Sequence, residues 1–127
     1  MNENQKFSII DRAKSFKYAF NGFKLFFINE HNGRIHLFAA IVAIALSFCL
    51  RLSAYEWIAV LLVIAMVIIA EIINSAIEKL ADVVSPEYHP KIKTVKDLAA
   101  AGVLVAAFVA VAVGLIIFLP KLFACIG

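Results

Sequence analysis

Three long runs of apolar residues dominate the chain and predict three membrane-spanning helices. The runs comprise residues 35–50, 57–77 and 98–119. A helix needs about 20 residues, at a rise of about 1.5 Å each, to cross the hydrocarbon core of a bilayer. The second and third runs reach this length, and the first does so if Arg34 and Arg51 extend their side chains to the two interfaces. The connection 51–56 has room only for a turn, so the first two spans are expected to form an antiparallel hairpin.

A different pattern precedes the first span and predicts an amphipathic helix over about residues 7–29. Phenylalanines recur there at the spacing i, i+4, i+7 and i+11, which places them on one helical face. They are Phe16, Phe20, Phe23 and Phe27. Lysines occupy the other faces, as in helices that lie in the membrane interface. We therefore expect a surface helix, whose simplest role is to anchor the chain to anionic lipid.

Composition agrees with a membrane protein. Of the 127 residues, 64% are hydrophobic and the mean hydropathy is +0.95, whereas soluble domains are about half apolar. The length allows a single domain, residues 1–127, and excludes a membrane domain joined to a soluble catalytic domain. The predicted fold class is an all-α membrane protein with three transmembrane helices and an N-terminal amphipathic surface helix. Any chemistry has to be built on the spans and their short connections.

Basic residues are distributed unevenly and predict the orientation in the membrane. Ten of the twelve Lys and Arg residues lie in segments 1–34 and 78–97, and only Arg51 and Lys121 lie on the other side. Cytoplasmic loops of membrane proteins are enriched in Lys and Arg. The N-terminus and the 78–97 loop are therefore expected in the cytoplasm, and the C-terminus outside.

Four polar residues occupy one narrow face at the end of the second run. They are Glu71, Asn74, Glu78 and Asp82. At about 100° per residue they fall within an arc of roughly 80°, and acidic groups inside a bilayer usually have a function. One interpretation is structural, with Glu78 and Asp82 as interfacial charges and Asn74 as a contact between helices. The functional interpretation makes Glu78 and Asp82 a cation site and Glu71 a general base, since a buried carboxylate takes up a proton more readily.

Further polar residues flank the spans on the same side of the membrane. They are Asn29 and Glu30 before the first span and Glu87, Tyr88, His89, Lys96 and Asp97 in the 78–97 loop. Carboxylate oxygens with lysine nearby suit Mg²⁺ bound to a polyphosphate. Neither GxxxxGK[ST] nor GxGxxG occurs, so no general nucleotide-binding motif is present. The residues alone predict a small three-span protein with a carboxylate-rich cytoplasmic site.

Three segments resemble a known family in sequence, order and spacing. They read SFKYAFNG (15–22), NEHNGRIH (29–36) and EIINSAIEKLADVVSPEYHPKIKTVKD (71–97). Over about residues 7–119 the chain resembles the small integral-membrane prokaryotic lipid kinases, which comprise diacylglycerol kinases and undecaprenol kinases. The resemblance implies a homotrimer in the bacterial cytoplasmic (inner) membrane with active sites at subunit interfaces. It also implies MgATP-dependent phosphorylation of a lipid hydroxyl, on diacylglycerol or undecaprenol, and no nucleic-acid partner.

Positions that match the family motifs take their roles from this resemblance. Glu71 corresponds to the catalytic base, and Glu30 and Glu78 correspond to the carboxylates that hold the metal of the nucleotide. Asn74 and Asp82 belong to the polar core of the motif. The positions that correspond to nucleotide contacts are Tyr18, Glu30, Glu78, Glu87, Tyr88, His89, Lys96 and Asp97. The polar face of the second span then runs from the metal down to the acceptor hydroxyl.

The chain departs from the family pattern near its start. Asp11 stands where members often carry a basic residue for the nucleotide, and Arg12 beside it is the candidate substitute. The segments EHN (30–32) and SPEYHP (85–90) resemble the undecaprenol-kinase branch more than the diacylglycerol-kinase branch.

Two other classes of function compete with a lipid kinase. A small oligomeric transporter or proton-relay protein accounts for Glu71 as an intramembrane relay. It does not account for the accompanying set of Glu30, Glu78, Lys96 and Asp97. A non-catalytic assembly subunit needs no carboxylates at fixed spacing.

Overall fold

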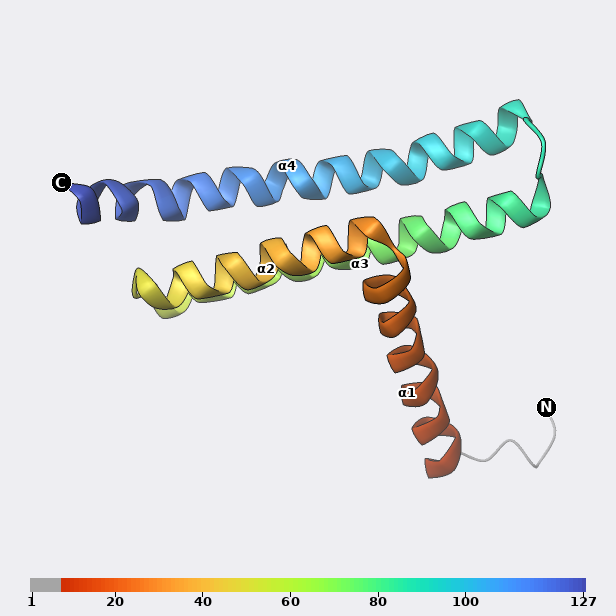
Figure 1. Cartoon of the computed structure of the whole chain (residues 1–127), viewed down its shortest axis with the longest axis horizontal. Coiled ribbons are helices and arrows are strands. Elements are labelled where there is room, and N and C mark those ends of the chain that lie inside the picture. The colour runs from red at the N-terminus through yellow and green to blue at the C-terminus, as the bar shows by residue number, and fades with distance from the viewer. Residues whose placement is uncertain (1–7) are drawn as a thin grey trace.

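The computed structural model describes residues 8–127, which are helical along most of their length. In chain order the elements are α1 (Ile9–Lys24), the π-helical turn η1 (Leu25–Asn29), α2 (His31–Cys49), α3 (Ala54–Val84) and α4 (Pro90–Ile126). Helices α2, α3 and α4 run side by side, and α3 contacts both of the others. Helix α1 projects away from this bundle at a steep inclination (Figure 1). The predicted start of the surface helix at residue 7 lies outside the described residues.

The prediction of three spans is confirmed by three helices that are long and apolar enough to cross a membrane. They have 19, 31 and 37 residues for α2, α3 and α4 respectively. Since a span needs only about 20 residues, α3 and α4 extend well beyond the apolar runs. Helix α4 also continues past Pro120 to Ile126. The extra turns of α3 and α4 carry several charged residues of the predicted site, namely Glu78, Asp82, Lys96 and Asp97.

The connection between α2 and α3 is the tight hairpin that the short segment 51–56 predicted. Arg51 has a positive φ of 54°, which reverses the chain direction. Ser53 then begins α3 with a capping box, in which its hydroxyl accepts from the Glu56 amide at 3.3 Å and Glu56 Oε1 accepts from the Ser53 amide at 2.9 Å. The buried apolar side chains packed at this end are Leu52, Val60 and Ile117.

A close approach of backbone to backbone sets the bend between α1 and α2. Gly33 faces the carbonyl group of Phe26 so closely that a Cβ atom would overlap it. Glu30 caps α2 in an extended conformation, and Arg34 Nη1 donates to the Ile28 carbonyl at 2.9 Å. The bend therefore requires glycine, and it places the first turns of α2, with Glu30 and His36, against α3.

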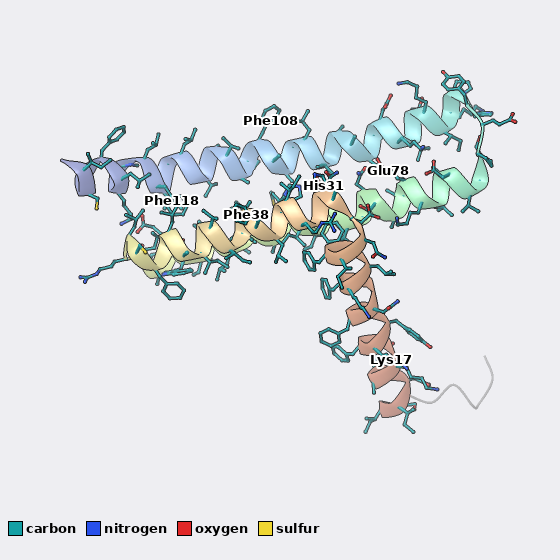
Figure 2. All side chains as sticks on the ribbon, in the orientation of Figure 1. Lys17, His31, Phe38, Glu78, Phe108 and Phe118 are labelled. Carbon is teal, nitrogen blue, oxygen red and sulfur yellow. The ribbon has the colours of Figure 1, made fainter. Side chains whose placement is uncertain are left out.

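Helix α1 covers most of the predicted surface helix, and its residues are exposed throughout. Phe16 and Phe20 are exposed, and Phe23 stacks on Phe27 of η1 with 6.2 Å between ring centroids. Figure 2 shows side chains projecting on several sides of α1, and Lys17 lies part-way along the helix, away from the bundle. A helix is therefore present in this segment, whereas its amphipathic character and its position in a membrane interface stay predictions.

Candidate active site

Glu71, the predicted base, is buried on α3 and contacts a histidine of α2. Its Oε1 lies 2.9 Å from Nε2 of His36, and the two side chains are 7% and 25% exposed respectively. A buried carboxylate is costly unless a hydrogen-bond donor compensates for the lost water. The contact provides that compensation and ties the second turn of α2 to the middle of α3.

Asn74 lies one helical turn from Glu71 and is also buried, with 8% of its surface exposed. Its Oδ1 is buried and accepts no hydrogen bond from any residue of the described range 8–127. Such atoms nearly always have a partner in folded proteins. The oxygen is therefore suited to a donor that a ligand or a second subunit supplies.

The predicted metal carboxylates lie where α2 begins beside α3. Glu30 Oε1 is 2.5 Å from Nζ of Lys79, and Glu78 precedes that lysine in α3. In the view of Figure 2, Glu78 lies on α3 just beyond the point at which α1 leaves the bundle. The structure thus connects Glu30, from one motif, to the segment of α3 that carries Glu78, from another.

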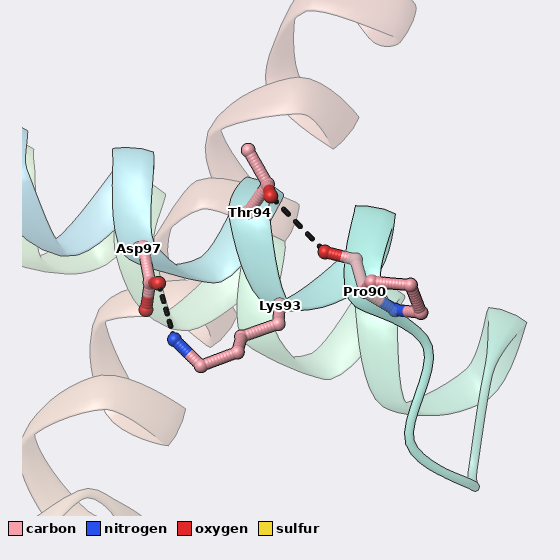
Figure 3. Close-up of polar contacts among 4 residues, drawn as sticks. All are labelled: Pro90, Lys93, Thr94 and Asp97. Carbon is pink, nitrogen blue, oxygen red and sulfur yellow. Dashed lines mark hydrogen bonds and ion pairs between the residues drawn. The ribbon is translucent and has the colours of Figure 1, made fainter.

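The end of α4 nearest the connecting loop contributes two further ion pairs. Lys96 Nζ lies 2.6 Å from Asp82 Oδ1 and joins α4 to α3. Within α4, Lys93 Nζ lies 2.6 Å from Asp97 Oδ2, and the Thr94 hydroxyl donates to the Pro90 carbonyl at 3.0 Å (Figure 3). Both lysines therefore sit next to carboxylates in the segment that the sequence assigned to nucleotide contacts.

A hollow of about 310 Å³ lies at this end of the bundle and gathers several predicted nucleotide residues. It is lined by Asp82, Ser85, Pro86, Glu87, Tyr88, His89, Ile92, Lys93 and Lys96. Tyr18 is not part of it, because it lies on α1, where it is 69% exposed. Among the predicted nucleotide residues the structure therefore brings Glu87, Tyr88, His89 and Lys96 together, whereas Tyr18, Glu30, Glu78 and Asp97 do not line this hollow.

A second cavity, an apolar groove, lies between α2, α3 and α4. Its volume is about 330 Å³, and among its described lining residues His36 alone is polar. The remaining walls are alanine, valine, isoleucine, glycine and phenylalanine side chains of the three spans. The groove is therefore suited to bind an apolar chain, and it ends at His36, which contacts Glu71.

Comparison with known proteins identifies the family. The family described as "Prokaryotic diacylglycerol kinase" matches residues 17–118. The chain belongs to the prokaryotic diacylglycerol kinase family. The undecaprenol kinase of Bacillus subtilis is 38% identical over 86% of this chain and 89% of its own length. A diacylglycerol kinase of Synechocystis is 38% identical over 85% of this chain and 62% of its own length, and that of Escherichia coli K12 is 34% identical over 77% and 80% respectively.

Membership of this family confirms the predicted resemblance and the prediction of a lipid kinase. It favours an enzyme over the transporter and the non-catalytic subunit. The three apolar helices agree with a multi-pass membrane kinase. The roles of the individual residues, the nucleotide and the metal remain predictions.

The donor atoms on the described residues fit a metal ion that arrives with a nucleotide. Residues 8–127 contain no group of three His, Cys, Asp or Glu side chains that could hold a metal by themselves. Mg²⁺ in kinases is typically bound by one or two carboxylates together with phosphate oxygens and water. Glu30, beside Lys79, and Glu78 supply hard oxygen donors of that kind, so the residues present are suited to such an ion.

Three side chains contact predicted site residues although the sequence pattern had assigned no role in the site to them. His36 contacts Glu71, Lys79 contacts Glu30, and Lys93 contacts Asp97. His36 carried a usable signal, because it is an ionisable residue within the first apolar run, and that criterion had singled out Glu71. The two lysines carried no such signal, since lysines near a span end are common.

Proposed function

We propose that the chain transfers the γ-phosphoryl group of MgATP to the hydroxyl of a membrane lipid at the cytoplasmic interface. One observation carries the proposal: the buried Glu71 carboxylate, held by His36, lies between a polar cluster and an apolar groove. A lipid kinase needs such an arrangement, because it must bring a water-soluble nucleotide to a membrane-bound alcohol. Family membership supports the same activity.

In the proposed mechanism Glu71 accepts the proton of the acceptor hydroxyl as the oxygen attacks the γ-phosphorus. The bond to the β-γ bridging oxygen breaks, and ADP leaves with that oxygen. Phosphoryl transfer depends on alignment and charge neutralisation more than on covalent participation by the protein. General-base catalysis of this kind contributes about 10²–10⁴-fold to the rate.

The loop end of the bundle, which we define as residues 85–89 with the adjoining turns of α3 and α4, is proposed to bind the nucleotide. Lys96 would exchange its contact with Asp82 for a phosphate oxygen. Tyr18, Glu87, Tyr88, His89 and Asp97 are proposed as further contacts. Glu30 and Glu78 would hold the Mg²⁺ that enters with ATP, and this ion neutralises phosphate charge when bound.

For the acceptor we propose a polyprenol alcohol such as undecaprenol, with diacylglycerol as the competing substrate. The Bacillus undecaprenol kinase matches this chain over nearly the whole of both sequences. The segment SPEYHP (85–90) points the same way. The apolar groove beside His36 provides space for an apolar chain of either lipid.

We propose an inner-membrane topology with the N-terminus and residues 78–97 in the cytoplasm. The asymmetry of Lys and Arg supports it. Helix α1 would then lie in the cytoplasmic interface, with its phenylalanines toward lipid and its lysines toward the headgroups. Its steep inclination to the spans agrees with that position (Figure 1).

We also propose a homotrimer with active sites between subunits. Tyr18 and the loop hollow lie apart in the single chain, and Asn74 Oδ1 lacks a partner within residues 8–127. A second copy could bring the dispersed contacts together and cover these groups. The mass of the detergent-solubilised protein tests this assembly, and a purely monomeric active enzyme would contradict it.

The activity is tested with purified protein in mixed micelles and ATP labelled at the γ-phosphate. Undecaprenol and diacylglycerol are offered separately, and micelles without protein provide the background. We expect label in extracted lipid, with undecaprenol labelled faster. Label no greater than in micelles without protein for both lipids would overturn the kinase proposal, whereas faster labelling of diacylglycerol would overturn only the choice of acceptor.

A further inference from the structure

His36 occupies a position between the two parts of the proposed reaction centre. On one side its Nε2 lies 2.9 Å from Glu71 Oε1. On the other side its ring forms part of the wall of the apolar groove, where it is the one polar lining residue among those described. A lipid chain in the groove would therefore meet His36 immediately before its hydroxyl reaches Glu71.

The contact engages one oxygen of the Glu71 carboxylate. With its proton on Nε2, the imidazole donates to Oε1 and leaves Oε2 as the second acceptor of the same group. A carboxylate held by one oxygen cannot rotate freely about its terminal torsion. Its other oxygen is then presented in a fixed direction, which is what a general base needs.

The local backbone supports a fixed His36. The histidine lies one turn after Gly33, whose close approach to the Phe26 carbonyl holds the start of α2 in place. Its ring is only 25% exposed, so its orientation is limited by its neighbours. The base and its partner come from different helices, and their distance therefore depends on how α2 packs on α3.

We infer that His36 is a positioning residue for Glu71: it holds Oε1 so that Oε2 faces the hydroxyl of a lipid in the apolar groove. This inference rests on the proposed lipid kinase activity. The alternative is a contact that only joins α2 to α3. The two hypotheses predict different effects of replacing His36 on turnover when Glu71 has already been replaced by Gln.

The test measures kcat and the KM for MgATP of wild type, His36→Ala, Glu71→Gln and the double variant. We expect His36→Ala to lower kcat by about 10²-fold, the loss typical of a misplaced catalytic group, with the KM for MgATP nearly unchanged. The double variant should be no slower than Glu71→Gln alone, because His36 acts through that carboxylate. His31→Ala, at an exposed histidine of the same helix, is the matched control and should retain wild-type turnover.

Two amide variants at His36 test whether the position of the donor atom matters, or only the presence of a polar group. The Nε2 amide of His36→Gln can reach the place of the ring Nε2, whereas the shorter amide of His36→Asn matches the ring Nδ1. We expect His36→Gln to recover most of the turnover and His36→Asn to resemble His36→Ala. This pair also serves if His36→Ala fails to fold.

Three outcomes would overturn the inference while leaving the kinase intact: normal kcat in His36→Ala, a further loss in the double variant, or equal activity of the Gln and Asn variants. Wild-type protein that labels no lipid at all would overturn the proposed function, and the inference with it. The two failures are therefore distinguishable in one set of assays.

Discussion

The two ends of the helical bundle are built differently. The hairpin end, residues 50–53 with the adjoining turns, is held by the Ser53 capping box and by buried Leu52, Val60 and Ile117. The loop end is held by exposed ion pairs, among them Lys96 with Asp82 and Lys93 with Asp97. One end is thus closed by local caps and apolar packing, and the other by charges.

Because of this difference, the contacts that stabilise the bundle and the contacts that a ligand could replace lie at opposite ends of the molecule. Exposed ion pairs contribute only about 0–1 kcal/mol to stability, so a lysine can leave its carboxylate for a phosphate at little cost. A cap and a packed core cannot be exchanged in that way without unfolding the end of the bundle. The loop end is therefore suited to bind and release a charged ligand, while the hairpin end keeps the spans in register.

The largest effect is expected at Glu71, where the polar face lies deepest. Glu71→Gln should lower kcat by about 10²–10⁴-fold, because the amide cannot accept the hydroxyl proton. The KM for MgATP should change little, since the nucleotide residues lie at the loop end. Steady-state kinetics in mixed micelles measures both constants. Glu56→Gln, a carboxylate of the same helix at the hairpin end, is the control, and near-normal turnover of Glu71→Gln would refute its role as the base.

Gly33→Ala should disturb the bend that presents Glu30 and His36 to α3. The added Cβ overlaps the Phe26 carbonyl, and overpacking of this kind typically costs about 1–3 kcal/mol. We expect a lower unfolding temperature in detergent and lower turnover. Gly102→Ala is the matched control, because nothing lies within 4 Å of its added Cβ. Equal behaviour of the two variants would show that the bend tolerates a side chain.

Lys96→Met should weaken the binding of MgATP and leave the stability of the protein nearly unchanged. Losing one hydrogen bond to a charged phosphate, worth about 1.5–3 kcal/mol, should raise the KM for MgATP about tenfold or more. Unfolding should hardly change, since the Asp82 contact is exposed. Kinetics at varied MgATP, with thermal unfolding in parallel, provides the measurement. An unchanged KM would remove Lys96 from the nucleotide site.

The smallest effect is expected from Lys121→Met at the hairpin end. It removes the 3.2 Å ion pair with Glu56, which should lower stability by less than about 1 kcal/mol. Turnover and the KM for MgATP should stay at wild-type values. A clear loss of turnover would show that the hairpin end also affects the reaction, and it would contradict the distinction between the two ends.

Much of the fold could be predicted from the sequence, because it depends on local properties. Uninterrupted apolar runs determine spans, and the short segment 51–56 permits only a hairpin. The polar face of Glu71, Asn74, Glu78 and Asp82 follows from helical periodicity alone. The ends of α4 were harder to predict: it begins at Pro90 and continues to Ile126, beyond the apolar run 98–119, since polar helical turns outside a membrane leave no hydropathy signal.

The sequence by itself determined which side chains are available, and tertiary structure decided which of them meet. His36 and Glu71 are 35 positions apart, and their contact depends on the packing of α2 against α3. That packing depends in turn on the bend at Gly33, where two backbone segments touch. Periodicity describes one helix at a time, so it placed the base on a face of α3. It could not supply the partner, because a contact between helices is a property of their relative position.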